Sequence, residues 1–281
     1  MIKKSFRIIL NFILIILLFQ CSINTKENNI QSNKNTLQVH FIDVGQGDSI
    51  LIQVNNKNLL IDSGPNKSED KLKKYLKELN ISKFDYIIAT HPHEDHIGNM
   101  SYIINNFDVL NFYAPKVENS TKAFETMVES LIRKDLKIKV LKANIKSIDL
   151  GKNIVVDVFS PLSNSYEDLN NYSPIVKISY GNTSFLFTGD AEELSENEVL
   201  NAGFDLKCDV LKIGHHGSSS STSEKFLKAS NPSIAVISVG EDNTYGHPTD
   251  TVLSRLKETK IYRTDINGNI VITSDGLSLK W

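Results

Sequence analysis

Short segments in which hydrophobic and polar residues alternate, or in which hydrophobic residues run together, follow one another along the chain after residue 36. Such segments, rich in β-branched residues and bounded by glycine, asparagine or proline, predict strands. They cover 37–44, 49–54, 58–64, 84–90, 153–161, 174–181, 183–189, 208–214, 233–240, 261–265 and 269–274. A glycine-containing turn joins the first two, and Asn267 followed by Gly268 predicts a hairpin between the last two.

Hydrophobic residues three and four positions apart replace this alternation elsewhere and predict helices. These helices cover 69–80, 97–107, 191–203, 221–230 and 248–259. Because strands alternate with helices in both halves, the pattern indicates the α/β class. We expect two sheets packed against each other with helices on their outer faces, a four-layer αββα sandwich.

Residues 1–21 have the composition of a secretory signal. The stretch 8–19 is almost entirely hydrophobic and follows three positive charges, at Lys3, Lys4 and Arg7. It is shorter than the roughly 20 residues that a stable transmembrane helix needs. We therefore expect export, with an uncleaved anchor as the less favoured alternative.

Cys21 ends this segment and resembles the lipidated cysteine of bacterial lipoproteins, although Gln20 stands where a small residue is usual. Residues 22–36 are polar, rich in asparagine and lysine and without periodicity, which is typical of a flexible tether. The folded domain would then occupy 37–281. We expect it outside the cytoplasm, either attached to the membrane by lipid or secreted.

The composition, 40% hydrophobic and 23% charged with a net charge of −2, is that of an ordinary globular protein. It lacks the basic balance of many nucleic-acid-binding domains. Two basic segments, 71–77 and 131–142, would attract a polyanion or would simply form solvated faces. If Cys21 carries lipid, Cys208 is the one remaining thiol, and its hydrophobic surroundings in the sequence predict burial.

The chemically richest segment is THPHEDHIGN, residues 90–99. It carries His91, His93, Asp95 and His96 directly after a predicted strand, whose rigidity fixes where the loop begins. Pro92 favours an extended backbone, so positions 91 and 93 point the same way, while Asp95 and His96 open a helix and face another point. Imidazole and carboxylate suit zinc, and also manganese or iron. A polar surface loop is the alternative, but this density of ligands favours a metal site.

The H-x-H-x-D-H motif of this segment resembles that of the metallo-β-lactamase superfamily of binuclear metal hydrolases. The ordered set HFIDVGQGDSILI, LLIDSG, IIATHPHEDHIGN, FLFTGDAEELSE, DVLKIGHHGS and YGHP is similar to the hydrolase domain of ComEC-type competence proteins and to related secreted phosphorylcholine esterases. The similarity covers nearly everything from Leu37 to Trp281. It implies the αββα fold and two divalent cations, Zn²⁺ first and Mn²⁺ as the alternative.

The resemblance also assigns roles to later residues. Asp190 matches the family's metal-bridging aspartate. His247 is expected to complete the second metal site, and His215 to contact substrate or supply a proton, with the reverse assignment left open. His216 either takes part directly in catalysis or supports the ligands. The residues expected beside the ligands are Asp62, which orients the histidine loop or merely forms a turn, together with Asp48 and Ser173.

One feature departs from many members of the superfamily. The chain has no histidine between residues 97 and 214, and the segment 170–173 stands where a further ligand is common. The first metal would then be held by His91, His93 and Asp190 with water. Occupancy by one metal rather than two is left open.

The resemblance implies hydrolysis of a phosphodiester by water that two cations activate, with Asp95 orienting the water while it binds metal. The expected substrate is extracellular DNA or RNA, and the alternative is a phosphorylcholine ester of cell-surface polymers. The motif set disfavours a β-lactam. A lipid-anchored binding protein with a vestigial metal site is the alternative from a different class. No protein partner is implied.

Overall fold

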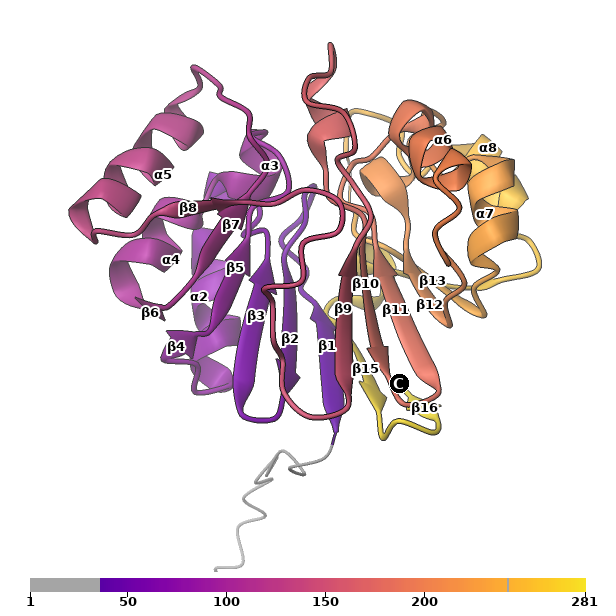
Figure 1. Cartoon of the computed structure of the whole chain (residues 1–281), viewed down its shortest axis with the longest axis horizontal. Coiled ribbons are helices and arrows are strands. Elements are labelled where there is room, and N and C mark those ends of the chain that lie inside the picture. Colours follow the sequence, from indigo (N-terminus) through magenta and orange to yellow (C-terminus); the bar gives the residue numbers. More distant parts are fainter. Residues whose placement is uncertain (1–35, 242) are drawn as a thin grey trace, which may run out of the picture. The chain divides into compact units, whose positions relative to one another are not determined.

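The computed structural model describes residues 36–241 and 243–281, which belong to one compact unit (Figure 1). The predicted signal segment 1–21, its lipidation site Cys21 and nearly all of the predicted tether lie outside the described residues. Within the described ranges, no helix is long and hydrophobic enough to cross a membrane.

Eight strands form the first sheet, in the order β16-β15-β1-β2-β3-β5-β7-β8. The strands from β15 to β3 pair antiparallel, and those from β3 to β8 pair parallel. Their bounds are β1 Leu37–Phe41, β2 Ile50–Val54, β3 Lys57–Ile61, β5 Tyr86–Ile88, β7 Phe112–Ala114, β8 Ile138–Val140, β15 Ile270–Ser274 and β16 Leu279–Lys280. A separate two-stranded ladder pairs β4 (Lys83–Phe84) with β6 (Asp108–Val109).

Six strands form the second sheet, in the order β14-β13-β12-β11-β10-β9. The strands from β11 to β14 are parallel, so their carboxyl ends lie at one edge. The bounds are β9 Ile154–Val158, β10 Val176–Tyr180, β11 Thr183–Phe187, β12 Val210–Lys212, β13 Ile234–Ile237 and β14 Lys260–Arg263.

Helices cover the outer face of each sheet, as Figure 1 shows at the left and right of the molecule. The first sheet is covered by α2 (Glu69–Glu78), α3 (Glu94–Ile97), α4 (Met100–Asn106) and α5 (Lys122–Arg133). The second is covered by α6 (Glu193–Asn201), α7 (Glu224–Ser230) and α8 (Asp250–Arg255). Four shorter helices complete the elements, namely α9 (Thr264–Asn267) and the 3₁₀ turns η1 (Asn66–Ser68), η2 (Leu169–Tyr172) and η3 (Gly214–Gly217).

The period-two pattern of the strands explains the layers. In β2, Ile50 and Ile52 point into the hydrophobic core between the two sheets, whereas Leu51 points into the core beneath the helices. The second sheet divides its side chains in the same way, with Val210 between the sheets and Leu211 beneath α6 to α8. Three hydrophobic cores therefore separate four layers, and the predicted αββα sandwich is confirmed.

The predicted hairpin around Asn267 and Gly268 is wrong. β14 pairs with β13 in the second sheet, whereas β15 pairs with β1 in the first. The segment between them forms α9 and carries the chain from one sheet to the other. Gly268 has a φ of 64° and ends that helix, so the Asn-Gly pair marks a helix end and not a two-residue turn.

The burial predicted for Cys208 is confirmed, and a histidine outside the metal segment is buried as well. Cys208 is buried in the core beneath α6 to α8, and burial raises the pKa of its thiol far above the ordinary range. His40 is buried on β1, where its Nδ1 lies 2.9 Å from the Tyr75 hydroxyl. Burial lowers the pKa of His40 to about 4, so the ring is neutral at physiological pH.

Candidate metal centre

The segment of closely spaced ligands begins where β5 ends. Asp62, at the end of β3, fixes this segment because its carboxylate accepts hydrogen bonds from the Thr90 backbone N–H at 2.8 Å and from the Thr90 hydroxyl at 2.7 Å. The chain bends at residues 91 and 92, His93 has extended backbone, and α3 then begins at Glu94. The predicted helix that carries Asp95 and His96 is present, whereas the predicted extended part is reduced to His93.

Two turns of the second sheet bring the remaining ligands to the same place. Asp190 follows β11, and its backbone N–H donates to the Ser173 hydroxyl at 3.1 Å. His215 and His216 follow β12 in η3, where both adopt left-handed backbone with φ of 47° and 52°. Two successive non-glycine residues in this region are unusual and are held there by surrounding structure, a feature that clusters at functional sites.

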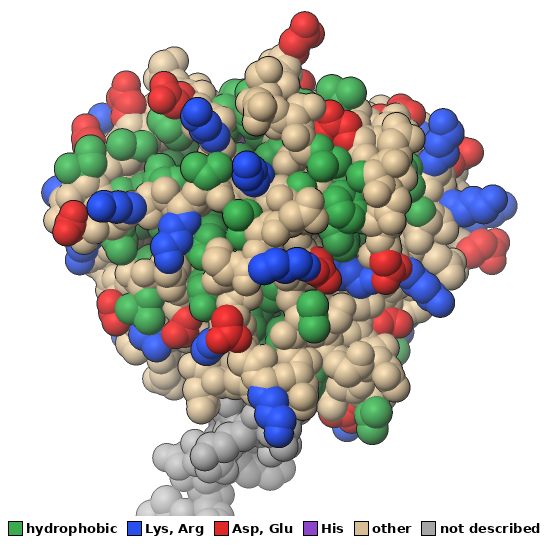
Figure 2. Space-filling model, in the orientation of Figure 1, with side chains coloured by type: hydrophobic (Ala, Val, Ile, Leu, Met, Phe, Trp, Pro, Cys, Tyr) green, Lys and Arg blue, Asp and Glu red, His purple; other side chains and the backbone are tan. Residues whose placement is uncertain are grey.

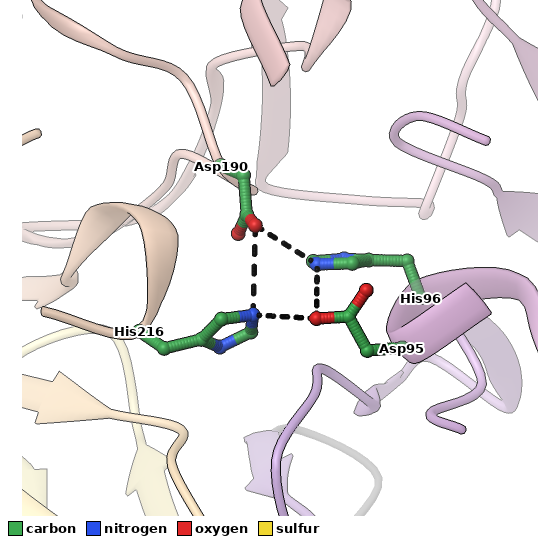
Figure 3. Close-up of side chains that lie close together, drawn as sticks. All are labelled: Asp95, His96, Asp190 and His216. Carbon is green, nitrogen blue, oxygen red and sulfur yellow. Dashed lines mark ion pairs between the residues drawn. The ribbon is translucent and has the colours of Figure 1, made fainter. Parts of the chain in front are cut away.

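Asp95, His96, Asp190 and His216 converge on one point (Figure 3). Each offers one ligand atom, and these four atoms all lie within 4.8 Å of one another. The Asp190 Oδ2 atom is 3.1 Å from His96 Nε2 and 3.5 Å from His216 Nε2. The Asp95 Oδ2 atom is 3.2 Å from His216 Nε2.

The surroundings of these histidines fit a cation. His96 Nδ1 lies 2.8 Å from Asp62 Oδ2, and His216 Nδ1 lies 2.9 Å from the Ser238 carbonyl oxygen. These partners take the proton of each ring at Nδ1, so that each Nε2 presents a lone pair to the cluster. Both Nε2 atoms are buried and form no hydrogen bond within the described part of the chain. Lone pairs facing carboxylate oxygens are stabilised by a cation between them.

His91 and His93 converge on a neighbouring point. His91 Nε2 lies 3.0 Å from His93 Nδ1 and 3.9 Å from Asp190 Oδ2. Asp190 therefore lies between the two sets of nitrogen atoms, as a bridging carboxylate would. The sequence lacks the further histidine ligand that many members of the superfamily carry, and segment 170–173 stands in its place. Ser173 of this segment lies beside His91, with its hydroxyl 3.3 Å from His91 Nδ1.

The charges of the cluster depend on one another. Burial alone would lower the pKa of His96, but the carboxylates of Asp190 and Asp95 raise it well above its usual range. Burial would raise the pKa of Asp190, and the neighbouring His216 and His96 instead hold it well below its usual range. The carboxylates of Asp190 and Asp95 therefore stay ionised and need positive charge beside them. Protonated histidines supply this charge when no metal is bound, and a bound metal ion would replace those protons.

A buried ion pair lies directly beneath this cluster. Lys212, with no exposed surface, places its Nζ atom 2.5 Å from Asp48 Oδ2 and 3.9 Å from Asp190 Oδ1. The other Asp48 oxygen lies 3.6 Å from His216 Nδ1. Asp48 thus contacts the cluster through His216, and Lys212 neutralises the negative charge of Asp48.

A cavity of about 390 Å³ opens above the metal cluster. Its lining includes His215, His247 and Tyr245 together with Asp95, Asp190 and His216. The structure therefore brings His216, and not the predicted His247, into the four-ligand cluster. His247 lies beside His215, with ring centroids 5.6 Å apart, and its assignment as a ligand stays a prediction.

Two residues of the site were not singled out from the sequence. Glu192 lies two positions after Asp190, and its Oε1 atom is 3.3 Å from His215 Nδ1. Lys212 stands in the segment that precedes the paired histidines. A lysine inside an otherwise hydrophobic strand is the signal that could have identified Lys212. Glu192 is one of four acidic residues in the helical segment 191–203 and carries no such signal.

The fold and the site define a class of protein, an αββα sandwich whose strand ends carry a cluster of residues able to hold a metal ion. The chain belongs to the metallo-beta-lactamase superfamily, because the model of this family matches residues 42–241. The resemblance noted in the sequence is therefore confirmed.

Relatives of the chain carry competence-related names. ComE operon protein 3 of Bacillus subtilis is 32% identical over 254 residues, which are 83% of this chain and 32% of that protein. Competence protein ComA of Neisseria gonorrhoeae is 28% identical over 239 residues, 84% of this chain and 32% of that protein. The chain thus spans about a third of the length of these relatives.

Solved structures agree on the fold. The metallo-beta-lactamase fold protein YhfI from Bacillus subtilis matches with a TM-score of 0.58, covering 85% of this chain and 100% of that chain. Its sequence identity is 12%, so this likeness concerns the fold alone.

Proposed function

We propose that this chain hydrolyses phosphodiester bonds of extracellular nucleic acid with two bound divalent cations, Zn²⁺ or Mn²⁺. The observation that carries the proposal is the convergence of two ligand sets on Asp190, with His91 and His93 on one side and His96 and His216 on the other. When bound, two cations lower the pKa of water and polarise the phosphoryl oxygens.

The chain's own residues hold this centre in place. Asp62 and the Ser238 carbonyl fix the rings of His96 and His216 through their Nδ1 atoms, so that both rings need no reorientation when metal binds. Asp95 lines the cavity, and its side chain is 30% exposed whereas those of His216 and Asp190 are 2% exposed, so Asp95 would orient the attacking water.

His215 is the residue that we expect to move a proton. Its Nδ1 faces Glu192 Oε1 at 3.3 Å, and its Nε2 lies on the side of Asp190 Oδ2 at 3.9 Å. Because Glu192 lies beside Nδ1, Nε2 is the ring atom that would face the substrate and donate a proton to its leaving oxygen. Asn170 is the third member of this group of polar side chains, because its Nδ2 atom lies 3.5 Å from both His215 Nδ1 and Glu192 Oε1.

Nucleic acid is the favoured substrate because of the relatives, one of which is named a competence protein. Recognition would be local. On the face shown in Figure 2, lysine and arginine side chains are interspersed with aspartate and glutamate and form no single basic surface. On this face, therefore, no broad positive field would contribute to phosphate binding.

We also propose that the chain acts outside the cytoplasm, attached to the membrane through Cys21. The support is the composition of residues 1–21. Incorporation of labelled fatty acid into the full chain, lost in Cys21→Ser, tests this part independently of any activity. Incorporation that persists in the variant would contradict it.

Asp190→Ala is the decisive test of the two-metal proposal. The full chain, loaded with Zn²⁺ or Mn²⁺, is incubated with linear and circular DNA, with and without chelator. We expect chelator-sensitive cleavage that falls at least ~10³-fold in the variant, because several kcal/mol of charge stabilisation depend on the bridged cations. Bound metal is measured in parallel and should fall with activity.

Asp70→Ala, an exposed aspartate on α2, is the matched control and should keep both metal and activity. Cleavage that survives Asp190→Ala would overturn the two-metal scheme. Bound metal without cleavage of any nucleic acid would overturn the choice of substrate, and cleavage of a phosphorylcholine ester instead would replace it.

A further inference from the structure

We propose that Tyr245 is a stacking platform for a nucleobase next to the scissile phosphate. This inference rests on the proposed phosphodiesterase function and specifies which part of the substrate the protein recognises. Its basis is the position of one exposed aromatic ring at the mouth of the metal cavity.

Three rings form a row from solvent to the metal cluster. Tyr245, 68% exposed, stacks on His247 with ring centroids 5.8 Å apart and an interplanar angle of 23°. His247 in turn contacts His215 edge-on, with centroids 5.6 Å apart. All three line the cavity that contains Asp190. A nucleobase stacked on the open face of Tyr245 would extend this row of rings. The phosphate attached to that nucleotide could then reach the metal cluster.

The loop that presents Tyr245 is held by its own hydrogen bonds. Asn243 Nδ2 donates to the carbonyl oxygens of Gly240 at 3.0 Å and His247 at 2.7 Å. The His247 backbone N–H donates to Asn243 Oδ1 at 3.0 Å. The exposed ring is thus supported before any ligand arrives, which reduces the entropy lost on binding.

The geometry favours a nucleobase over a quaternary ammonium group. Recognition of such cations uses a cage of several aromatic faces. Among the residues that the structure describes, Tyr245 is the only phenylalanine, tyrosine or tryptophan that lines this cavity. A single open ring face is what base stacking needs, and it accepts any base because each has a π-face. Bases of a duplex already stack on one another, so the platform selects unpaired nucleotides.

The test compares binding of two single-stranded oligonucleotides of equal length, one with bases and one abasic, both with phosphorothioate linkages that resist cleavage. Fluorescence anisotropy with the metal-loaded full chain gives each Kd. We expect Tyr245→Ala to weaken binding of the base-bearing strand about 5- to 100-fold and to leave the abasic strand within roughly twofold. Tyr245→Phe should restore wild-type affinity, because it keeps the ring.

Trp281→Ala is the matched control, an exposed aromatic residue (59%) outside the cavity lining, and should change neither Kd. Equal losses for both strands in Tyr245→Ala, or no loss for either, would overturn the platform even if the chain cleaves DNA. Loss of glycerophosphocholine binding with unchanged oligonucleotide binding would assign the ring to an ammonium group instead. Because these readouts are affinities, they decide the question whether or not phosphodiester cleavage is observed.

Discussion

Lys212 is a fully buried charged residue, and burying its charge costs free energy of folding. Its ammonium group has no exposed surface and lies against Asp48 Oδ2, the Gly189 carbonyl oxygen at 3.1 Å and, further away, Asp190. A buried charge of this kind is stable only while its partner is present. The pair therefore ties the end of β12 to the turn after β1 and to the turn that carries the bridging aspartate.

Lys212→Met should destabilise the metal-free protein by about 3–5 kcal/mol, because Asp48 is then left as an uncompensated buried charge. Chemical denaturation of the metal-free chain measures this free energy of unfolding. The double variant Asp48→Asn/Lys212→Met should recover part of the loss, since it removes both charges together. If the double variant loses the sum of the two single losses, the two residues do not act as a pair.

At the scale of elements, the turn between β1 and β2 supports the metal loop. A Cβ atom on Gly47 would lie 2.2 Å from the Asp95 carbonyl oxygen and 2.8 Å from Pro65 Cδ, so only glycine fits. The next residue, Asp48, donates its backbone N–H to the same Asp95 oxygen at 3.2 Å. The turn thus sets the position of the start of α3.

Gly47→Ala should lower metal affinity roughly 10- to 100-fold, the range typical when a residue supporting a ligand is lost, because the new methyl group displaces Asp95. Competition with a chromogenic chelator measures the affinity. Gly45→Ala in the same turn is the control, since nothing lies within 4 Å of its added Cβ and only its positive φ of 76° causes strain. Equal affinities of the two variants would show that the close approach is unimportant.

Elements differ in how well the sequence predicted them. Strands such as β2 and β11 were predictable because each alternates between two buried faces. β8 is an edge strand whose three residues are all exposed, so its sequence shows no alternation between buried and exposed positions. The basic segment 131–142 contains the end of α5 as well as β8, and therefore has no single period that would predict either element. The failed hairpin has another cause, because short-range turn chemistry carries no information about which sheet a strand joins.

The metal site shows the same limit. The segment 90–99 could be predicted because its ligands are neighbours in sequence. The sequence favoured His247 as the later histidine ligand, with His215 as the alternative, whereas the structure places His216 in the four-ligand cluster. The distance of His216 from Asp95 depends on how the left-handed turn of η3 folds back over the sheet edge. Backbone conformations of this kind are imposed by the rest of the fold and leave little trace in a single sequence.

At the scale of the whole molecule, the metal ligands come from both sheets. His91 to His96 follow strand β5 of the first sheet, and Asp190 and His216 follow strands of the second. A bound cation therefore links the two halves of the sandwich. Anything that binds only the native state also stabilises it against unfolding.

Metal at a hundredfold excess over its Kd should raise the free energy of unfolding by about 2.7 kcal/mol and Tm by roughly 5–10 °C. Thermal denaturation with Zn²⁺ or Mn²⁺, and with chelator, measures the shift. Asp190→Ala should show almost none, because it removes the carboxylate shared by both ligand sets. A shift of the same size in that variant would place the stabilising metal elsewhere.

The return of β15 to the first sheet has a consequence for the order of events in biosynthesis. Every residue of β1, from Leu37 to Phe41, faces a residue of β15, which spans Ile270 to Ser274. While a ribosome has yet to make that segment, one whole side of β1 lacks its hydrogen-bond partners. The half of the domain that is translated first is thus completed last, so its folding must wait until β15 has been translated.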